Sequence, residues 1–99
     1  MGKYLFAYRG GAMAEGEAAQ QEAMAAWGAW FGKLGGAVTD PGAPLGASRA
    51  VGSNGPVSSG LSGYTVVTAD NLDAAVALTD GCPLFAAGGS VDVYEAVEM

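Results

Sequence analysis

Residues 3–11 read KYLFAYRGG. Tyr4, Phe6 and Tyr8 occupy alternate positions, and the residues between them are apolar as well. This composition predicts a β-strand over Lys3–Arg9, which ends at the two glycines. Because both faces of the strand are apolar, we expect a covering layer on each side of the sheet to which it belongs.

The stretch Glu15–Leu34 predicts a helix, and the glycine pair that follows would end it. Its large apolar residues fall within about 120° of arc at a period of 3.6 residues. They are Ala23, Met24, Trp27, Trp30, Phe31 and Leu34. Gly28 and Gly32 weaken this helix by up to about 1 kcal/mol each. Two explanations stay open: a close approach of the helix backbone to the sheet or to a second subunit, or simple tolerance in an alanine-rich helix.

The rest of the chain alternates between strand and helix signals, and Asp70 and Asn71 offer side-chain oxygens to cap the second helix. The predicted elements are a strand at Ala37–Asp40, a hairpin of Ser48–Val51 and Pro56–Ser58 around Asn54-Gly55, a strand at Gly63–Ala69, a short helix that buries Leu72, Ala75, Val76 and Thr79, and a last strand at Val91–Glu98. Right-handed crossovers then place both helices on one face of a four-stranded antiparallel sheet. The expected class is α+β, with a ferredoxin-like βαββαβ order and an inserted hairpin.

The composition predicts a partner for the open face of this sheet. The chain has 99 residues, of which 51% are apolar and only 14% charged. So small a protein needs more polar surface than this to stay monomeric, and we expect a homodimer in which two sheets meet face to face. The net charge of −6 repels phosphate backbones and anionic lipid surfaces, so neither nucleic acid nor a membrane is an expected partner.

The chain contains no histidine and a single cysteine, Cys82. An internal disulfide and a Cys/His metal site are therefore excluded, and neither a metal nor another cofactor is expected. The N-terminal residues lack the apolar core of a secretion signal, and no apolar stretch approaches the roughly 20 residues of a membrane span. A reducing cytoplasm fits these features.

Three blocks of sequence together resemble the YCII-related proteins of the DGPF type. They are YLFAYRGG at residues 4–11, WGAWFGKLG at residues 27–35, and GCP at residues 81–83 with GGSVDV at residues 88–93. The resemblance covers nearly the whole chain, which would form one YCII-related domain over residues 1–99. It implies a ferredoxin-like fold and a dimeric α/β barrel.

The resemblance also implies where a site would lie. Better-known members carry a histidine and an acidic residue at a cleft, and some members are encoded beside sigma factors or fused to them. In the register of this chain the histidine position is occupied by Trp27, and the acidic counterpart is Asp40. Proton transfer by imidazole is therefore absent.

Five residues are the candidate ligand-binding set: Tyr8, Arg9, Trp27, Asp40 and Tyr94. Each also has a structural interpretation. Asp40 precedes Pro41-Gly42 and suits a turn. Arg9, like Arg49, suits either a bidentate anion clamp or a salt bridge.

The two tryptophans, Trp27 and Trp30, suit either a ligand platform or the core. Cys82 suits a buried structural thiol. Three functions follow as hypotheses: a small-molecule binding or accessory dimer without imidazole chemistry, a dimeric-barrel enzyme that uses the Asp40 carboxylate with Arg9, and an interaction module linked to sigma-factor regulation. No catalytic residue is assigned.

Overall fold

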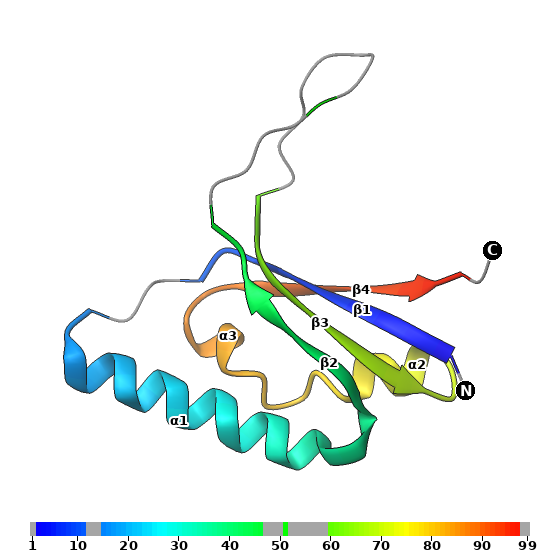
Figure 1. Ribbon diagram of the computed structural model, residues 1–99, viewed down its shortest axis with the longest axis horizontal. Helices are drawn as coiled ribbons and strands as arrows, with labels where there is room; N and C mark the ends of the chain where they lie inside the picture. Colours follow the sequence, from blue (N-terminus) through cyan, green and yellow to red (C-terminus); the bar gives the residue numbers. More distant parts are fainter. Residues whose placement is uncertain (1, 12–14, 47–50, 52–59, 98–99) are drawn as a thin grey trace.

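The computed structural model describes residues 2–11, 15–46, 51 and 60–97 (Figure 1). Its elements are β1 (Gly2–Arg9), α1 (Glu17–Leu34), the 3-10 turn η1 (Gly35–Ala37), β2 (Val38–Pro44), β3 (Leu61–Ala69), α2 (Leu72–Ala77), α3 (Pro83–Ala86) and β4 (Ser90–Ala96). The α+β class is confirmed. The predicted hairpin around Asn54-Gly55 lies outside the described residues, apart from Val51.

The four strands form one antiparallel sheet in the order β2-β3-β1-β4. The strand β1 lies inside the sheet, between β3 and β4. Phe6 pairs with Thr65 on β3 and with Val93 on β4. The strand β1 thus holds β3 and β4 in register, although both lie far from it in the sequence.

The two faces of the sheet differ because side chains alternate along each strand. Tyr4, Phe6 and Tyr8 point towards the helices and form the core with residues of all three helices. Trp30 of α1, Ala75 of α2 and Leu84 of α3 belong to this core, so the three helices cover the same face. The opposite face is left open in a single chain.

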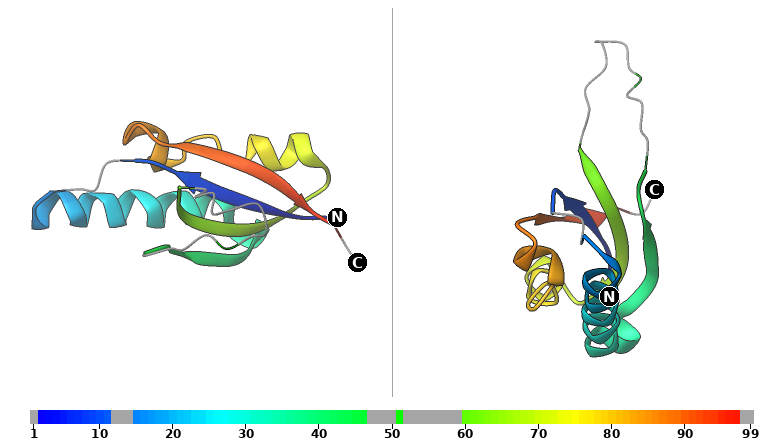
Figure 2. Two further views of the ribbon diagram at one scale, coloured as in Figure 1. Left: turned by 90° about the horizontal axis from the view of Figure 1, so that it is seen from above. Right: turned by 90° about the vertical axis from the view of Figure 1, so that its left-hand side faces the viewer.

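The helix α1 is attached to the sheet by its C-terminal half. Trp30 and Leu34 are buried, but Met24 is 75% exposed, so the expected apolar stripe is wrong at its N-terminal end. The cause is the direction of the helix, whose N-terminal turns extend beyond the ends of the strands (Figure 2). A Cβ added at Gly28 or Gly32 would meet nothing within 4 Å, which removes close approach to the sheet as their explanation.

The strand β2 is longer than the sequence predicted, since it includes both Pro41 and Pro44. It lies at an edge of the sheet, where a proline breaks no ladder on its outer side. Its pairing with β3 shifts register between Val38 and Asp40 and again between Asp40 and Ala43. Asp40 therefore lies within an irregular strand rather than at a strand end.

The short helix α2 begins as predicted, because the Asn71 side chain accepts a hydrogen bond from the Ala74 N–H at 2.8 Å. Its burial was predicted wrongly in part. Ala75 is buried, whereas Leu72 and Val76 are 45% and 48% exposed, because the helix packs on the sheet through its Ala75 side.

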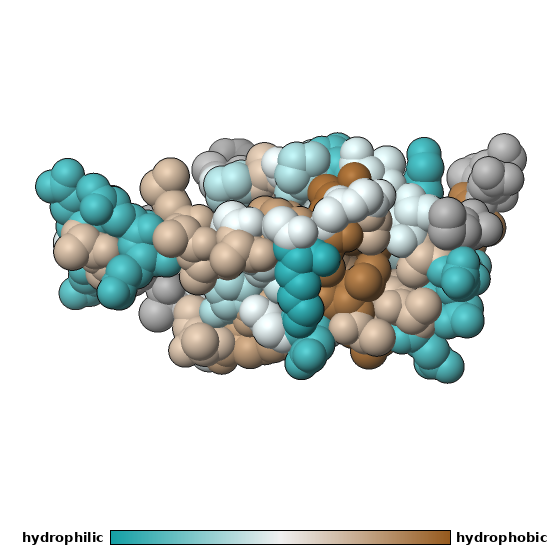
Figure 3. Space-filling view, turned by 90° about the horizontal axis from the view of Figure 1, so that it is seen from below, coloured by the Kyte–Doolittle hydropathy of each residue, from teal (hydrophilic) through white to brown (hydrophobic). Residues whose placement is uncertain are grey.

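The helix α3 was not predicted at all, since four residues show no usable periodicity; Pro83 occupies its first turn. The surface on the helical side is hydrophilic at the projecting N-terminal end of α1 and apolar beside its C-terminal end (Figure 3). Within the described ranges, we find no helix that combines the length and the apolar character needed to cross a membrane.

Candidate functional site

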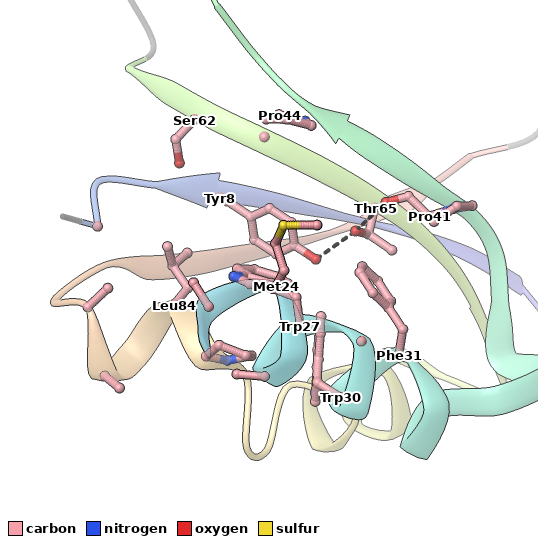
Figure 4. Close-up of a pocket in the computed structure, with 18 of the residues that line it drawn as sticks. Tyr8, Met24, Trp27, Trp30, Phe31, Pro41, Pro44, Ser62, Thr65 and Leu84 are labelled. Carbon is pink, nitrogen blue, oxygen red and sulfur yellow. Dashed lines mark hydrogen bonds between the residues drawn. The ribbon is translucent and has the colours of Figure 1, made fainter. Parts of the chain in front are cut away.

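A groove of about 1290 Å³ runs between α1, the β2 edge of the sheet and α3. We call it the α1 groove. Its walls carry Tyr8 of β1, Met24, Trp27 and Phe31 of α1, Pro41 and Pro44 of β2, Ser62 and Thr65 of β3, and Leu84 of α3 (Figure 4). The helix α1 packs against the core through Trp27, Trp30, Phe31 and Leu34, all in its C-terminal half.

An aromatic cluster forms one wall of the α1 groove. The ring centroids of Tyr8 and Trp27 lie 5.3 Å apart in an edge-on arrangement, and those of Trp27 and Trp30 lie 5.6 Å apart. Phe31 follows at 5.3 Å from Trp30. Trp30 is 3% exposed and stacks on Phe6, whereas Trp27 and Phe31 are half-buried. Trp30 is therefore a core residue, and Trp27 is both a packing residue and part of the groove surface.

A short hydrogen-bond chain crosses the base of the groove. The Tyr8 hydroxyl donates to Thr65 Oγ1 at 2.7 Å, and Thr65 Oγ1 donates to the Pro41 carbonyl at 3.0 Å (Figure 4). Burial raises the pKa of Tyr8 to about 12, and the hydrogen bond with Thr65 offsets this effect only in part. The phenol is therefore neutral at physiological pH and fixes the irregular edge strand to the core.

We expect stability to fall with rising pH in the window between the unfolded and folded pKa of Tyr8, from about 10 to about 12. In this window the unfolded chain has released the phenolic proton and the folded chain still holds it, so deprotonation favours unfolding. Urea titrations at pH 9 and pH 11 measure the fall. Tyr8→Phe should reduce the pH dependence, and an undiminished fall in that variant would contradict the assignment.

Arg9 and Tyr94 lie on the opposite face of the sheet from Tyr8 and Trp27. Arg9 Nε donates to Asp92 Oδ2 at 2.5 Å, and hydrogen bonds to Asp92 and Tyr94 raise the pKa of Arg9. The salt-bridge interpretation of Arg9 is the one that this geometry supports. The separation of Arg9 from Tyr8 could be predicted from the sequence, because successive residues of one strand point to opposite faces of the sheet.

Asp40 is exposed and does not line the α1 groove. Its Oδ1 accepts a hydrogen bond from the Gly42 N–H at 2.9 Å, which is the turn role considered above. Of the five candidate residues, only Tyr8 and Trp27 meet in the α1 groove, whereas Arg9 and Tyr94 contact each other on the opposite face of the sheet. Arg49 lies outside the described residues.

Cys82 is 3% exposed, and burial raises the pKa of its thiol. It precedes α3 directly, a neighbourhood that the sequence did not reveal. Among the described residues, no three His, Cys, Asp or Glu side chains come together as a group that could hold a metal ion.

Sequence reasoning missed Thr65 and the two prolines of β2 as groove residues. The sequence did contain a signal for Thr65. It lies two residues before Val67 on a strand of high β-propensity, and residues two apart on a strand point to the same face. The two prolines carried no such signal, because they line the groove only as a result of the position of β2 at the sheet edge that faces α1.

Comparison of the chain with family models, with curated proteins and with solved structures found no match. The resemblance to YCII-related proteins therefore stays a prediction from the three sequence blocks.

Proposed function

We propose that this chain is a small-molecule binding protein that holds an apolar or aromatic compound in the α1 groove. The observation that supports this most directly is the groove itself, a space of about 1290 Å³ with Tyr8, Trp27 and Phe31 on its walls. Ligand sites are typically concave and mostly apolar, with a few polar groups that orient the ligand. Tyr8 and Ser62 are polar groups of this kind.

The lining favours binding over catalysis. The chain has no histidine, and the Tyr8 phenol is held neutral by a pKa of about 12. Asp40 is bound to the Gly42 N–H, and Arg9 is paired with Asp92 on the other face. The carboxylate enzyme considered above would need Asp40 and Arg9 at one site.

Native mass spectrometry of freshly purified protein tests the proposal, because a retained compound appears as added mass on the folded chain. Trp27→Ala should remove most of this added mass, since it takes away the largest half-buried surface of the groove. Phe85→Ala is the matched control, because Phe85 is an aromatic residue on α3 that is 47% exposed and does not line the groove. Equal retention by both variants would contradict the proposal.

We further propose a ferredoxin-like fold and a dimer built through the open face of the sheet, as the resemblance to YCII-related proteins implies. The strand order β2-β3-β1-β4 supports this fold. The register places Leu5, Ala7 and Val66 together on the open face, with Tyr64 and Tyr94 beside them. Apolar faces of this kind are typically covered by a partner.

Light scattering should give a mass of twice 9.8 kDa at micromolar concentration. Leu5→Lys should give the monomer, because a lysine at the centre of the open face would be buried in the dimer but can reach solvent in a single chain. Val76→Lys introduces the same side chain on the exposed side of α2 and should leave the dimer intact. Circular dichroism checks that both variants fold. A wild-type monomer would contradict the dimer and leave the groove proposal standing.

A further inference from the structure

The two charged side chains that line the α1 groove are not equivalent. The Lys33 ammonium donates to the Asp80 carbonyl at 3.4 Å and lies 3.8 Å from its carboxylate, so an acidic neighbour already offsets its charge. Glu22 forms no ion pair within the part of the chain that the structure describes. Together with the net charge of −6, this makes the groove attractive to cations and repulsive to anions.

The Tyr8 oxygen gives the groove a hydrogen-bond acceptor. Tyr8 gives its proton to Thr65, which gives its own to the Pro41 carbonyl, so the Tyr8 oxygen can only accept from a ligand. The β2 wall offers few donors, because Pro41 and Pro44 have no N–H and the Gly42 N–H is bound to Asp40. The other side-chain donors of the lining residues, besides Lys33, are all uncharged: the Trp27 and Trp30 indoles, the Tyr64 phenol and the Ser62 hydroxyl, of which the Trp30 N–H is buried.

The aromatic wall adds a third contribution. The ring centroids of Trp27 and Phe31 lie 6.0 Å apart, and that of Tyr8 lies 5.3 Å from Trp27 on the other side. Cationic groups are attracted to the faces of such rings within about 6 Å of the centroid, and Trp is the strongest partner. Apolar and cationic parts of one ligand can therefore use the same wall.

We propose that the α1 groove selects organic ammonium ions that carry an aromatic or alkyl group. The apolar group packs against Trp27 and Phe31, an ammonium N–H donates to the Tyr8 oxygen, and Glu22 supplies the opposing charge. This inference rests on the proposed function, because it names the ligand class of the same groove.

Four probes of similar shape test the selection: 2-phenylethylammonium, its N-trimethyl derivative, 2-phenylethanol and 3-phenylpropanoate. Binding is followed by tryptophan fluorescence and by NMR shifts of the groove residues. We expect the ammonium ion to bind about tenfold more tightly than the alcohol. The carboxylate should bind more weakly than the alcohol, and added salt should reduce the preference for the cations.

Two variants separate charge from hydrogen bonding. Tyr8→Phe should weaken 2-phenylethylammonium and 2-phenylethanol by about three- to tenfold and leave the trimethyl derivative unchanged, since that probe has no N–H. Glu22→Gln should weaken both cations and leave the alcohol unchanged. Glu95→Gln is the matched control, because it makes the same change in net charge at an exposed position of β4 outside the groove.

Equal affinity for the ammonium ion and the alcohol would overturn the inference and leave the proposed function intact. The same holds if no probe binds but native mass spectrometry shows a retained compound of another class. If no probe binds and no compound is retained, both proposals fail. Equal losses of cation affinity in Glu22→Gln and Glu95→Gln would show that the overall charge acts, and would overturn the role of the groove in selection.

Discussion

Trp30→Ala is expected to lower the free energy of unfolding by about 3–5 kcal/mol, the range for a large aromatic residue removed from a core. Trp30 is 3% exposed, stacks on Phe6 at 6.2 Å and contacts Trp27 and Phe31. Together with Leu34 it fixes the C-terminal half of α1 in the core. Because a domain is stable by only about 5–15 kcal/mol, the variant should unfold at a much lower urea concentration.

Urea denaturation of the wild type and of Trp30→Ala measures this loss as a shift of the midpoint at constant slope. Trp27→Ala is the control on the same helix, and it should cost less because Trp27 is only half-buried. Trp30→Phe should cost less than Trp30→Ala. The phenyl ring keeps most of the packing, and the buried Trp30 Nε1, which has no hydrogen-bond partner among the described residues, is removed. Equal costs for Trp27→Ala and Trp30→Ala would contradict this view of α1.

Gly42→Ala is expected to be as damaging as a core substitution although Gly42 lies on an edge strand. The Gly42 φ is +75°, and a Cβ there would lie 1.8 Å from the Tyr64 carbonyl oxygen. The strained φ alone costs about 1–3 kcal/mol, and relief of the clash would separate β2 from β3. The separation would also remove the Pro41 carbonyl from Thr65, so the base of the α1 groove should open.

Gly28→Ala is the matched control, because the same substitution at this position should raise stability instead of lowering it. Nothing lies within 4 Å of a Cβ at this position, and alanine is favoured over glycine in a helix interior by up to about 1 kcal/mol. Thermal unfolding should therefore move down for Gly42→Ala and up for Gly28→Ala, by about 4–8 °C per kcal/mol in a chain of this size. A Gly42→Ala variant that melts with the wild type would show that β2 accommodates the side chain. Lower stability for Gly28→Ala would point to a second subunit against that helix face.

The strands of this fold could be predicted where the residues have a strong local preference. Tyr4, Phe6 and Tyr8 defined β1, and the run from Tyr64 to Thr68 defined β3, because alternation and β-propensity agree in both. The sequence was misleading where an element departs from its own pattern. Periodicity placed Met24 in the stripe of α1, but it contains no information on the angle at which the helix leaves the sheet.

The candidate site was predicted in part for a related reason. Tyr8 and Trp27 meet because each lies on the buried side of a regular element, and both of those sides could be identified from the sequence. Asp40 depends on a register shift in β2, which no local pattern reveals. Arg9 and Tyr94 were placed in the same candidate set as Tyr8, although strict alternation along β1 puts Arg9 on the other face.

The attachment of α1 by one end has a dynamic consequence. Its first turns, around Ala19 and Glu22, have few tertiary contacts, whereas Trp30 and Leu34 are held in the core. Amide hydrogens in the first turns should exchange by local fraying, and those near Trp30 only by global unfolding. The wall that carries Glu22 is thus the least stable part of the groove. A compound bound there must order the helix, so part of its binding free energy offsets the loss of conformational entropy of the protein.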